Sequence, residues 1–294
     1  MAGKLGDGRR IARQAGMNAP ISPRKPIPSL VFQTWKSKDV LPANFAYWRA
    51  TFEALNPRFD FRLWDDADNR RFVEDRFAWF LSTYDRFPAE IFRADVVRYL
   101  FLYEFGGVYA DMDTECLRPL DHLLTIDADV VLGRMGDPGF AHSIPNAIMI
   151  ARPRQSFWLL VLGLVMTEAE QGLRPEHTTG PVVLRRAVQL YGDESRRCEV
   201  DGMIAGVRER LSGDQQPAEA RSLIAILPKE ILYPLDWSDP IHQRFVRRPV
   251  VDEQRLLTAT EAAALFPKAF MVTYWAHSWE PVATGEAERS ATTS

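Results

Sequence analysis

Two carboxylates one residue apart, Asp111 and Asp113, are the side chains of this chain best suited to chemistry. They follow a short apolar segment, and in a strand the side chains at positions i and i+2 point to the same side of the backbone. Like charges this close repel each other unless a cation lies between them or one carboxylate takes up a proton. Carboxylates suit Mg²⁺ or Mn²⁺, which usually keep coordination positions open for phosphate. The pair therefore predicts an enzyme that uses a metal ion to handle a phosphorylated substrate.

The helix expected just before this pair carries a second polar group. Pro88 predicts its start and Gly106 its end, and its residues are mostly apolar, so we expect the helix to be largely buried. Asp95 and Arg98 interrupt it three residues apart, on one face. A structural salt bridge is the alternative, although a buried ion pair adds little stability. Beside a metal site we favour a functional pair, which would bind sugar hydroxyls or a phosphate.

Three other places are candidates for a site edge. Trp35 follows the first expected strand, where ligands of α/β sheets bind, and it would either stack on a nucleobase or belong to the core or a lid. Asn146 and the segment Thr179–Pro181 lie beside an expected strand and helix and would also pass as ordinary turns.

The cluster near the C-terminus offers a candidate for completing the metal site. His277 could bind the ion, with Ser278 and Trp279 touching a leaving phosphate. A single histidine is more often an ordinary surface or core residue, so both interpretations of His277 stay open.

The order of elements predicts one α/β domain with a mostly parallel sheet, because strands alternate with helices. The expected strands are Ile27–Thr34, Phe59–Trp64, Gly107–Ala110, Val130–Gly133, Asn146–Ala151, Leu223–Leu227 and Phe270–Tyr274. The expected helices are Ala43–Leu55, short stretches up to about Ser82, Pro88–Glu104, Gln155–Glu168 and Val182–Leu190. We expect Asp65–Asp68 to form an acidic turn and Gly192–Ala220 to be less regular.

Composition is that of an ordinary globular protein. Of the 294 residues, 46% are hydrophobic and 26% charged, and the net charge of −3 gives no electrostatic case for nucleic acid. Cys116 and Cys198 are far apart and form no CxxC pair, which argues against a disulfide scaffold or a zinc cluster and fits a reducing compartment.

Membrane signals are weak. No segment approaches the roughly 20 apolar residues that a spanning helix needs. Residues 1–26 are basic without the apolar core of a signal peptide, so we expect a disordered basic tail, with a weak contact to an anionic membrane as the alternative. Residues 284–294 are expected to be flexible. The expected location is cytoplasmic, with at most peripheral contact at the inner membrane face.

Four motifs in order give the chain a family resemblance. They are Phe32-Gln33-Thr34-Trp35, Leu63-Trp64-Asp65-Asp66, Arg93-Ala94-Asp95-Val96-Val97-Arg98-Tyr99 and Gly106-Gly107-Val108-Tyr109-Ala110-Asp111-Met112-Asp113. This string resembles the DXD-motif glycosyltransferases of family 32. That family includes the inositol phosphorylceramide mannosyltransferases and the yeast outer-chain α-mannosyltransferases, and the clostridial glucosylating toxins are distant relatives. The resemblance is densest over residues 27–124.

The resemblance implies a fold and an activity. The fold would be a GT-A-type, Rossmann-like single domain over residues 27–283. The activity would be a retaining, metal-dependent transfer of a hexose (mannose, glucose or galactose) to a hydroxyl of a glycan or glycolipid acceptor. The donor would be a nucleotide-sugar, either GDP-mannose or a UDP-hexose, and the cofactor Mn²⁺ or Mg²⁺.

The resemblance also implies roles for the acidic residues. Asp113 would bind the metal directly, and Asp111 would contact the ribose and donor sugar or the metal. The metal would neutralise the leaving diphosphate, and Asp95 would stabilise an oxocarbenium-like transition state. The acceptor would then attack on the face that the phosphate leaves.

The same resemblance implies a donor-binding set. Trp35 would stack on the base, and Ser278 and Trp279 would close over the diphosphate. The full set is Gln33, Trp35, Asp95, Arg98, Tyr109, Asn146, Ser278 and Trp279. The chain departs from the family at Phe32, where His is common, and at Thr273 and Tyr274, where a His pair is common. The second departure leaves the metal role of His277 open.

Two other functions remain as alternatives. Asp111-Met112-Asp113-Thr114 also matches the start of haloacid-dehalogenase-type Mg²⁺-dependent phosphatases, in which Asp111 would be the nucleophile. That function needs a downstream lysine and a later acidic pair. Lys229 and Lys268 are the downstream lysines, and no convincing acidic pair accompanies them. The third interpretation is a non-catalytic module that binds a sugar nucleotide or a partner.

Overall fold

A computed structural model describes residues 26–170, 174–218, 220–236, 239–240, 242 and 258–276. Residues 1–25 of the expected basic tail and residues 284–294 lie outside the described part of the chain. Within that part, no helix combines the length and the apolar character needed to cross a bilayer.

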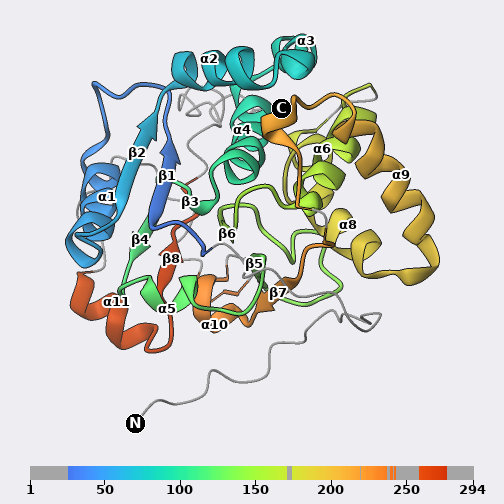
Figure 1. The fold of residues 1–294 in the computed structure, drawn as a ribbon. Helices are drawn as coiled ribbons and strands as arrows, with labels where there is room; N and C mark the ends of the chain where they lie inside the picture. The colour runs from blue at the N-terminus through green and yellow to red at the C-terminus, as the bar shows by residue number, and fades with distance from the viewer. Residues whose placement is uncertain are drawn as a thin grey trace, which may run out of the picture.

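A six-stranded sheet forms the centre of the structure, in the order β2-β1-β3-β6-β5-β7 (Figure 1). Its strands are β1 (Leu30–Thr34), β2 (Asp60–Trp64), β3 (Gly107–Ala110), β5 (Val130–Gly133), β6 (Ile148–Ala151) and β7 (Ile224–Leu227). β1 pairs in parallel with β2 and β3, and β5 with β7, whereas β6 runs antiparallel to both β3 and β5. The predicted α/β class with a mostly parallel sheet is confirmed.

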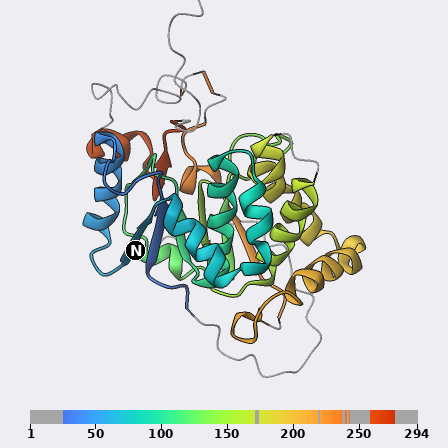
Figure 2. The ribbon, with the colours of Figure 1, turned by 90° about the horizontal axis from the view of Figure 1, so that it is seen from above.

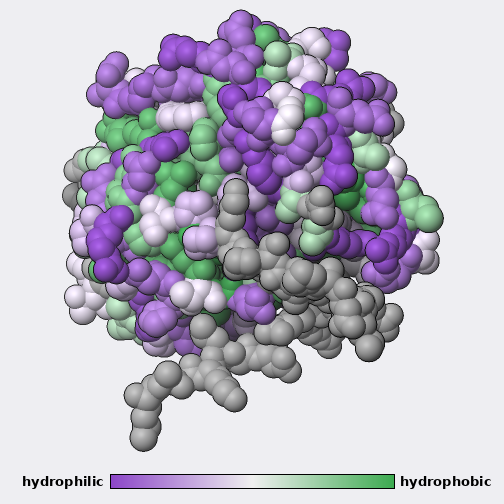
Figure 3. Space-filling model, viewed as in Figure 1, coloured by the Kyte–Doolittle hydropathy of each residue, from purple (hydrophilic) through white to green (hydrophobic). Residues whose placement is uncertain are grey.

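Helices cover both faces of this sheet (Figures 1 and 2). They are α1 (Ala43–Leu55), α2 (Asp66–Arg76), α3 (Ala78–Arg86), α4 (Glu90–Glu104), α5 (Asp121–Leu124), α6 (Ser156–Ala169), α7 (Pro175–Thr178), α8 (Pro181–Gly192), α9 (Arg197–Arg208), α10 (Lys229–Leu232) and α11 (Ala259–Leu265). On the surface shown in Figure 3, hydrophobic and hydrophilic residues are interspersed.

The alternation of side chains along the strands divides the core between the two faces. Phe32 of β1 stacks on Phe101 of α4, with ring centroids 3.7 Å apart, in the core formed with α2, α3, α4, α6, α8 and α9. Its neighbour Val31 points the opposite way and packs with Phe52 of α1 and Val108 of β3. Successive residues of a strand face opposite sides of the sheet. Neighbouring apolar residues such as these therefore make both faces of the sheet apolar.

A separate two-stranded sheet begins directly after the acidic pair. It consists of β4 (Thr114–Cys116) and β8 (Met271–Thr273), which run antiparallel. Trp48 of α1 stacks on Tyr274 just after β8, with ring centroids 4.7 Å apart. The sequence predicts the β8 strand, but neither β4 nor this second sheet.

Two glycines make the turn from α4 into β3. Gly106 and Gly107 have φ angles of 68° and 92°, which favour glycine. A Cβ atom at Gly107 would lie 2.5 Å from the carbonyl oxygen of Leu30 on β1. Glycine therefore allows β3 to enter the sheet close to β1.

Two helix ends differ from the sequence prediction. The segment expected as an acidic turn, Asp65–Asp68, is the start of α2, because Asp65 and Asp68 form a capping box that satisfies two backbone N–H groups. Helix α4 begins at Glu90 after the N-cap Ala89, so Pro88 precedes the helix instead of occupying its first turn.

The region expected to be irregular contains a regular helix, α9, which was missed. Val200, Ile204 and Val207 form a buried stripe at helical spacing, and α9 packs against α6. Four glycines and the charged residues of this region (192–220) weaken its helix signal, and packing on α6 outweighs that weakness.

The glycine turn gives a stability prediction. Gly107→Ala should lower the free energy of unfolding by about 2 kcal/mol, because the new Cβ meets Leu30 and alanine disfavours a positive φ. Gly202→Ala on α9 is the matched control. A Cβ there meets nothing within 4 Å, so this change should stabilise by about 0.5–1 kcal/mol. Urea unfolding of the three proteins measures both effects, and equal midpoints for wild type and Gly107→Ala would refute the first.

The two cysteines should differ in reactivity. Burial raises the pKa of the Cys116 thiol to about 12, whereas Cys198 is exposed. A thiol reagent at pH 8 should therefore modify Cys198 alone in the native protein, and both cysteines in denaturant. Mass spectrometry of peptides identifies the modified residue, and rapid labelling of Cys116 under native conditions would contradict its burial.

Candidate active site

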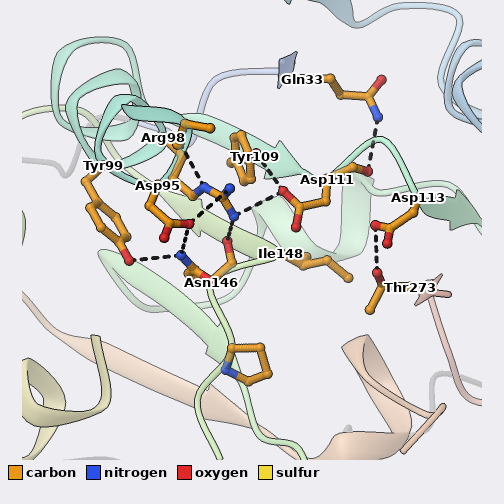
Figure 4. Close-up of polar contacts among 12 residues, drawn as sticks. Gln33, Asp95, Arg98, Tyr99, Tyr109, Asp111, Asp113, Asn146, Ile148 and Thr273 are labelled. Atoms are coloured by element: carbon orange, nitrogen blue, oxygen red, sulfur yellow. Dashed lines mark hydrogen bonds and ion pairs between the residues drawn. The ribbon is translucent and has the colours of Figure 1, made fainter. Parts of the chain in front are cut away.

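A buried arginine links two carboxylates at the centre of the site. The Arg98 Nη2 atom lies 3.2 Å from Asp95 Oδ1, and its Nη1 atom lies 3.0 Å from Asp111 Oδ1 (Figure 4). The side chains of Arg98 and Asp95 are 5% and 7% exposed, and that of Asp111 is 31% exposed. The guanidinium group of Arg98 thus links the buried face of helix α4 to the end of strand β3.

Two other segments hold the remaining positions around Asp95. Asn146 Nδ2 donates to Asp95 Oδ1 at 2.8 Å, and Thr179 Oγ1 donates to Asp95 Oδ2 at 3.0 Å. The Tyr99 hydroxyl accepts from Asn146 at 3.2 Å and donates to the carbonyl of Thr179 at 2.8 Å. The carboxylate of Asp95 is therefore fixed in orientation from three sides.

Burial and charge act in opposite directions on this network. Burial raises the pKa of Asp95 to about 6, although Arg98 and the hydrogen bonds from Asn146 and Thr179 oppose the rise. For Arg98, burial favours the neutral form, but Asp111, Tyr109 and Asp95 hold its pKa above the usual range. The arginine therefore stays charged, and the pKa of Asp95 stays above the usual range of an aspartate.

Asp111 lies in a turn, which changes the expected geometry. Strand β3 ends at Ala110, and the N–H of Thr114 donates to the carbonyl of Asp111 at 3.1 Å. The expectation that Asp111 and Asp113 share one side of a strand is wrong, because the strand ends before the pair. The Tyr109 hydroxyl donates to Asp111 Oδ1 at 2.6 Å, and Gln33 Nε2 donates to the Asp111 carbonyl at 3.5 Å.

Asp113 is held by the end of β8. Its Oδ1 atom accepts from Thr273 Oγ1 at 3.1 Å, and its Oδ2 atom accepts from the N–H of Ala276 at 2.7 Å. The N–H of Tyr274 donates to the Asp113 carbonyl at 2.9 Å. The second sheet therefore orients this carboxylate from a segment far along the chain.

The two carboxylates fit a metal ion that takes its other ligands from a substrate. Both are partly exposed and fixed in orientation. Among the described residues, no group of three or more His, Cys, Asp and Glu side chains gathers that could hold a metal alone. Mg²⁺ in nucleotide sites is commonly held by one or two carboxylates together with substrate phosphates. Asp111 and Asp113 form such an incomplete set.

The other expected site residues differ in their surroundings. Trp35 is half-buried after β1, and its ring meets that of Phe45 edge-on at 4.7 Å. Gln33 and Tyr109 are buried in the sheet, where Gln33 also accepts from Arg49 at 3.1 Å. His277, Ser278 and Trp279 lie outside the described residues.

The structure gives no support to the phosphatase alternative. Lys229 and Lys268, the downstream lysines, are exposed. Within the described part of the chain, Asp111 forms its ion pair with Arg98 instead. A nucleophilic carboxylate held by a buried guanidinium would be less reactive, since the ion pair stabilises the ionised form.

Sequence reasoning missed two residues of the network, Tyr99 and Thr273. Tyr99 lies four residues after Asp95 on the same helix, and this spacing could have revealed it. The sequence names Thr179 as a candidate for the edge of the site but does not predict its hydrogen bond to Asp95. Thr273 gave no signal, because a strand hydroxyl has no distinctive local pattern.

Comparisons with known proteins agree with the motif string. Residues 33–129 match the family described as a glycosyltransferase sugar-binding region containing a DXD motif. Inositol phosphoceramide mannosyltransferase 3 of Schizosaccharomyces pombe is 38% identical over 141 residues, which cover 45% of this chain and 38% of that protein. The initiation-specific α-1,6-mannosyltransferase of Saccharomyces cerevisiae is 33% identical over 109 residues, which cover 35% of this chain and 23% of that protein. The resemblance predicted from the sequence is confirmed, and this chain spans less than half the length of either relative.

A solved structure also resembles the chain. The PaToxG glycosyltransferase superposes with a TM-score of 0.42 at 16% identity, covering 67% of this chain and 83% of that one.

The central arginine gives a prediction about stability and pH. Arg98→Met should lower the free energy of unfolding by roughly 3–5 kcal/mol at pH 8, because Asp95 would be left buried without its cation. The pKa of Asp95 lies above its unfolded value, so the stability it contributes is present at low pH and is lost as the pH rises through about 6. Loss of Arg98 raises the pKa of Asp95 further. The free energy of unfolding that Arg98→Met loses relative to wild type should therefore be smaller at pH 5 than at pH 8.

Arg70→Met is the matched control, since Arg70 forms exposed ion pairs with Asp85 and Glu74. It should change stability little at either pH, because exposed pairs are screened by water. Denaturant unfolding at pH 5 and pH 8 measures all three proteins. A deficit of Arg98→Met that is the same at both pH values would contradict the role assigned to Asp95.

Proposed function

We propose that this protein is a metal-dependent glycosyltransferase that moves a hexose from a nucleotide-sugar to a hydroxyl group. The observation that carries the proposal is the buried Asp95–Arg98–Asp111 chain of ion pairs, which leads to the partly exposed Asp113. All four residues fall within residues 33–129, which match the DXD-containing sugar-binding family. We also propose that residues 27–283 form one GT-A-type domain.

The proposed donor is GDP-mannose or a UDP-hexose. The relatives named as mannosyltransferases favour mannose, and the name of one of them points to a glycolipid acceptor. A glycan is the other proposed acceptor class. For Trp35, its partial exposure after β1 supports a role in stacking on the base.

Asp111 and Asp113 would hold Mn²⁺ or Mg²⁺. The bound ion would act as a Lewis acid that neutralises charge on the departing diphosphate. The chain itself would contribute orientation: Thr273 and the N–H of Ala276 hold Asp113, and Tyr109 holds Asp111.

Asp95 and Arg98 would bind the donor sugar next to the metal. Asp95 is fixed by three donors, so it could accept a sugar hydroxyl or stabilise positive charge without reorganising. We propose transfer with retention, in which the acceptor attacks on the face that the phosphate leaves. Trapping a glycosylated Asp or Glu in the native protein would contradict this route.

The proposal predicts metal-dependent turnover that Asp113 controls. With Mn²⁺ or Mg²⁺, the wild-type protein should release the nucleoside diphosphate from one donor in a panel of GDP- and UDP-sugars. EDTA should abolish the release. Asp113→Asn should reduce it by at least about a hundredfold, because the ion that would neutralise charge on the departing diphosphate loses a charged ligand. Chromatography of the released nucleotide measures the rate.

Asp201→Asn is the control, because Asp201 lies on the outer helix α9 and forms a long, exposed contact with Arg197. It should keep the wild-type rate. Binding of a donor with equal affinity by wild type and Asp113→Asn, without turnover by either in the presence of glycan and glycolipid acceptors, would favour a binding module. Hydrolysis of small phosphate esters instead of nucleotide-sugars would favour the phosphatase.

A further inference from the structure

Trp275 has an unusual backbone conformation in the segment that holds Asp113. The N–H of Tyr274 donates to the Asp113 carbonyl at 2.9 Å, and that of Ala276 donates to Asp113 Oδ2 at 2.7 Å. Trp275, between these two donors, has a φ of 54°. Among the described residues other than glycine, Arg154 alone shares a positive φ. A bulky residue rarely adopts this left-handed region, so its surroundings must hold Trp275 there.

Two contacts fix the indole of Trp275. Its Nε1–H group donates to the carbonyl of Leu235 at 2.9 Å. Its ring stacks on that of Tyr233, with centroids 5.8 Å apart and planes at 22°. Both partners are fully buried and lie just after helix α10. A hydrogen bond at the ring edge and a contact across the ring face together fix the position and the tilt of the indole.

Tyr233 is in turn attached to the central sheet. Its hydroxyl accepts from the N–H of Ile148 on β6 at 2.6 Å and donates to the carbonyl of the same residue at 2.8 Å. A Cβ atom at Gly133 on β5 would lie 2.6 Å from two ring carbons of Tyr233, so only glycine leaves room for this ring. The indole of Trp275 is therefore fixed relative to the central sheet and not only to the small β4–β8 sheet.

The conformation of Trp275 decides where the next N–H group points. The φ and ψ angles of a residue set the direction of the peptide group that follows it relative to the one before. Thr273, before the turn, donates from Oγ1 to Asp113 Oδ1 at 3.1 Å (Figure 4), and Ala276, after the turn, donates to Oδ2. The two carboxylate oxygens of Asp113 are therefore held by donors on either side of Trp275 in the chain.

We infer that Trp275 is a positioning residue for the metal-binding carboxylate of Asp113. Its left-handed backbone, held by Tyr233 and Leu235, points the N–H of Ala276 at Asp113 Oδ2. Outer-shell donors of this kind orient a ligand and raise its affinity for the metal. The inference rests on the proposed function, and it assigns a role in metal affinity to an indole, which itself offers no metal ligand.

Binding of Mn²⁺ to the full chain tests this role without turnover. The electron paramagnetic resonance signal of free Mn²⁺ gives the dissociation constant for wild type, Trp275→Gly and Trp275→Ala. Trp275→Ala should weaken binding about tenfold, because an outer-shell contact to a ligand is lost. Trp275→Gly also loses the indole, but glycine adopts a positive φ readily. It should therefore bind Mn²⁺ roughly fivefold more tightly than Trp275→Ala.

The order of these two variants separates positioning from packing. Loss of the indole alone would affect both variants alike, and chain entropy would place glycine below alanine. Trp79→Ala is the control for removing a partly buried indole, since the Trp79 ring lies against Phe80 and Arg210. It should bind Mn²⁺ like wild type. Far-UV circular dichroism confirms that each variant is folded.

The Asp113→Asn background shows which site the measurement reports. Asp113→Asn should itself weaken Mn²⁺ binding, because a charged ligand is lost. Adding Trp275→Ala to this variant should change the affinity by less than about twofold, because the two residues act through the same contact.

A conservative variant covers the case in which Trp275→Ala does not fold. Trp275→Phe keeps a ring against Tyr233 but loses the hydrogen bond to Leu235. Its Mn²⁺ affinity should fall between those of wild type and Trp275→Gly. Wild-type affinity in Trp275→Phe would then overturn the inference.

Equal Mn²⁺ affinities of folded Trp275→Gly and Trp275→Ala, or wild-type affinity in Trp275→Ala, would also overturn it. Release of nucleotide from the donor panel by the wild-type protein is measured in parallel. Turnover together with either result would refute the role of Trp275 alone. The expected order of affinities without turnover would count against the transferase activity alone. A wild-type protein that binds no Mn²⁺ would refute both the metal site and the role of Trp275.

Discussion

The ion pairs of Arg98 are the interaction on which the rest of the site depends. One buried guanidinium lies 3.2 Å from a carboxylate on its own helix and 3.0 Å from another at the end of β3. Desolvating the charges of Arg98 and Asp95 is costly, and a buried ion pair is a poor source of stability. Its value here is geometric, because it fixes the position of α4 relative to the acidic turn.

The surrounding fold makes that group tolerable. Asn146 and Thr179 supply hydrogen bonds that the buried carboxylate of Asp95 requires, and they come from two different segments. The Tyr99 hydroxyl joins these two residues, because it accepts from Asn146 and donates to the carbonyl of Thr179. The glycine turn at residues 106 and 107 brings β3 beside β1, so that Gln33 reaches the backbone of Asp111. Core packing and site geometry are therefore parts of the same arrangement.

The sequence predicts most of the elements because their signals are local. Helix α1 and strands β3 and β5 match the expected bounds, since periodicity, glycine and proline mark them. The missed helix α9 and the unexpected small sheet depend on packing partners that a local pattern does not contain. The acidic segment at 65–68 was misread because a capping box and a turn share the same residue types.

The sequence by itself determined the chemistry: two carboxylates one residue apart, an Asp and an Arg one helical turn apart, and a motif order shared with sugar-transferring enzymes. Only the tertiary structure decided which residues meet. Asn146, Thr179 and Thr273 reach their aspartates from 51, 84 and 160 residues away along the chain. No spacing rule spans such separations, because the contacts exist only after the sheet and both helix layers have packed.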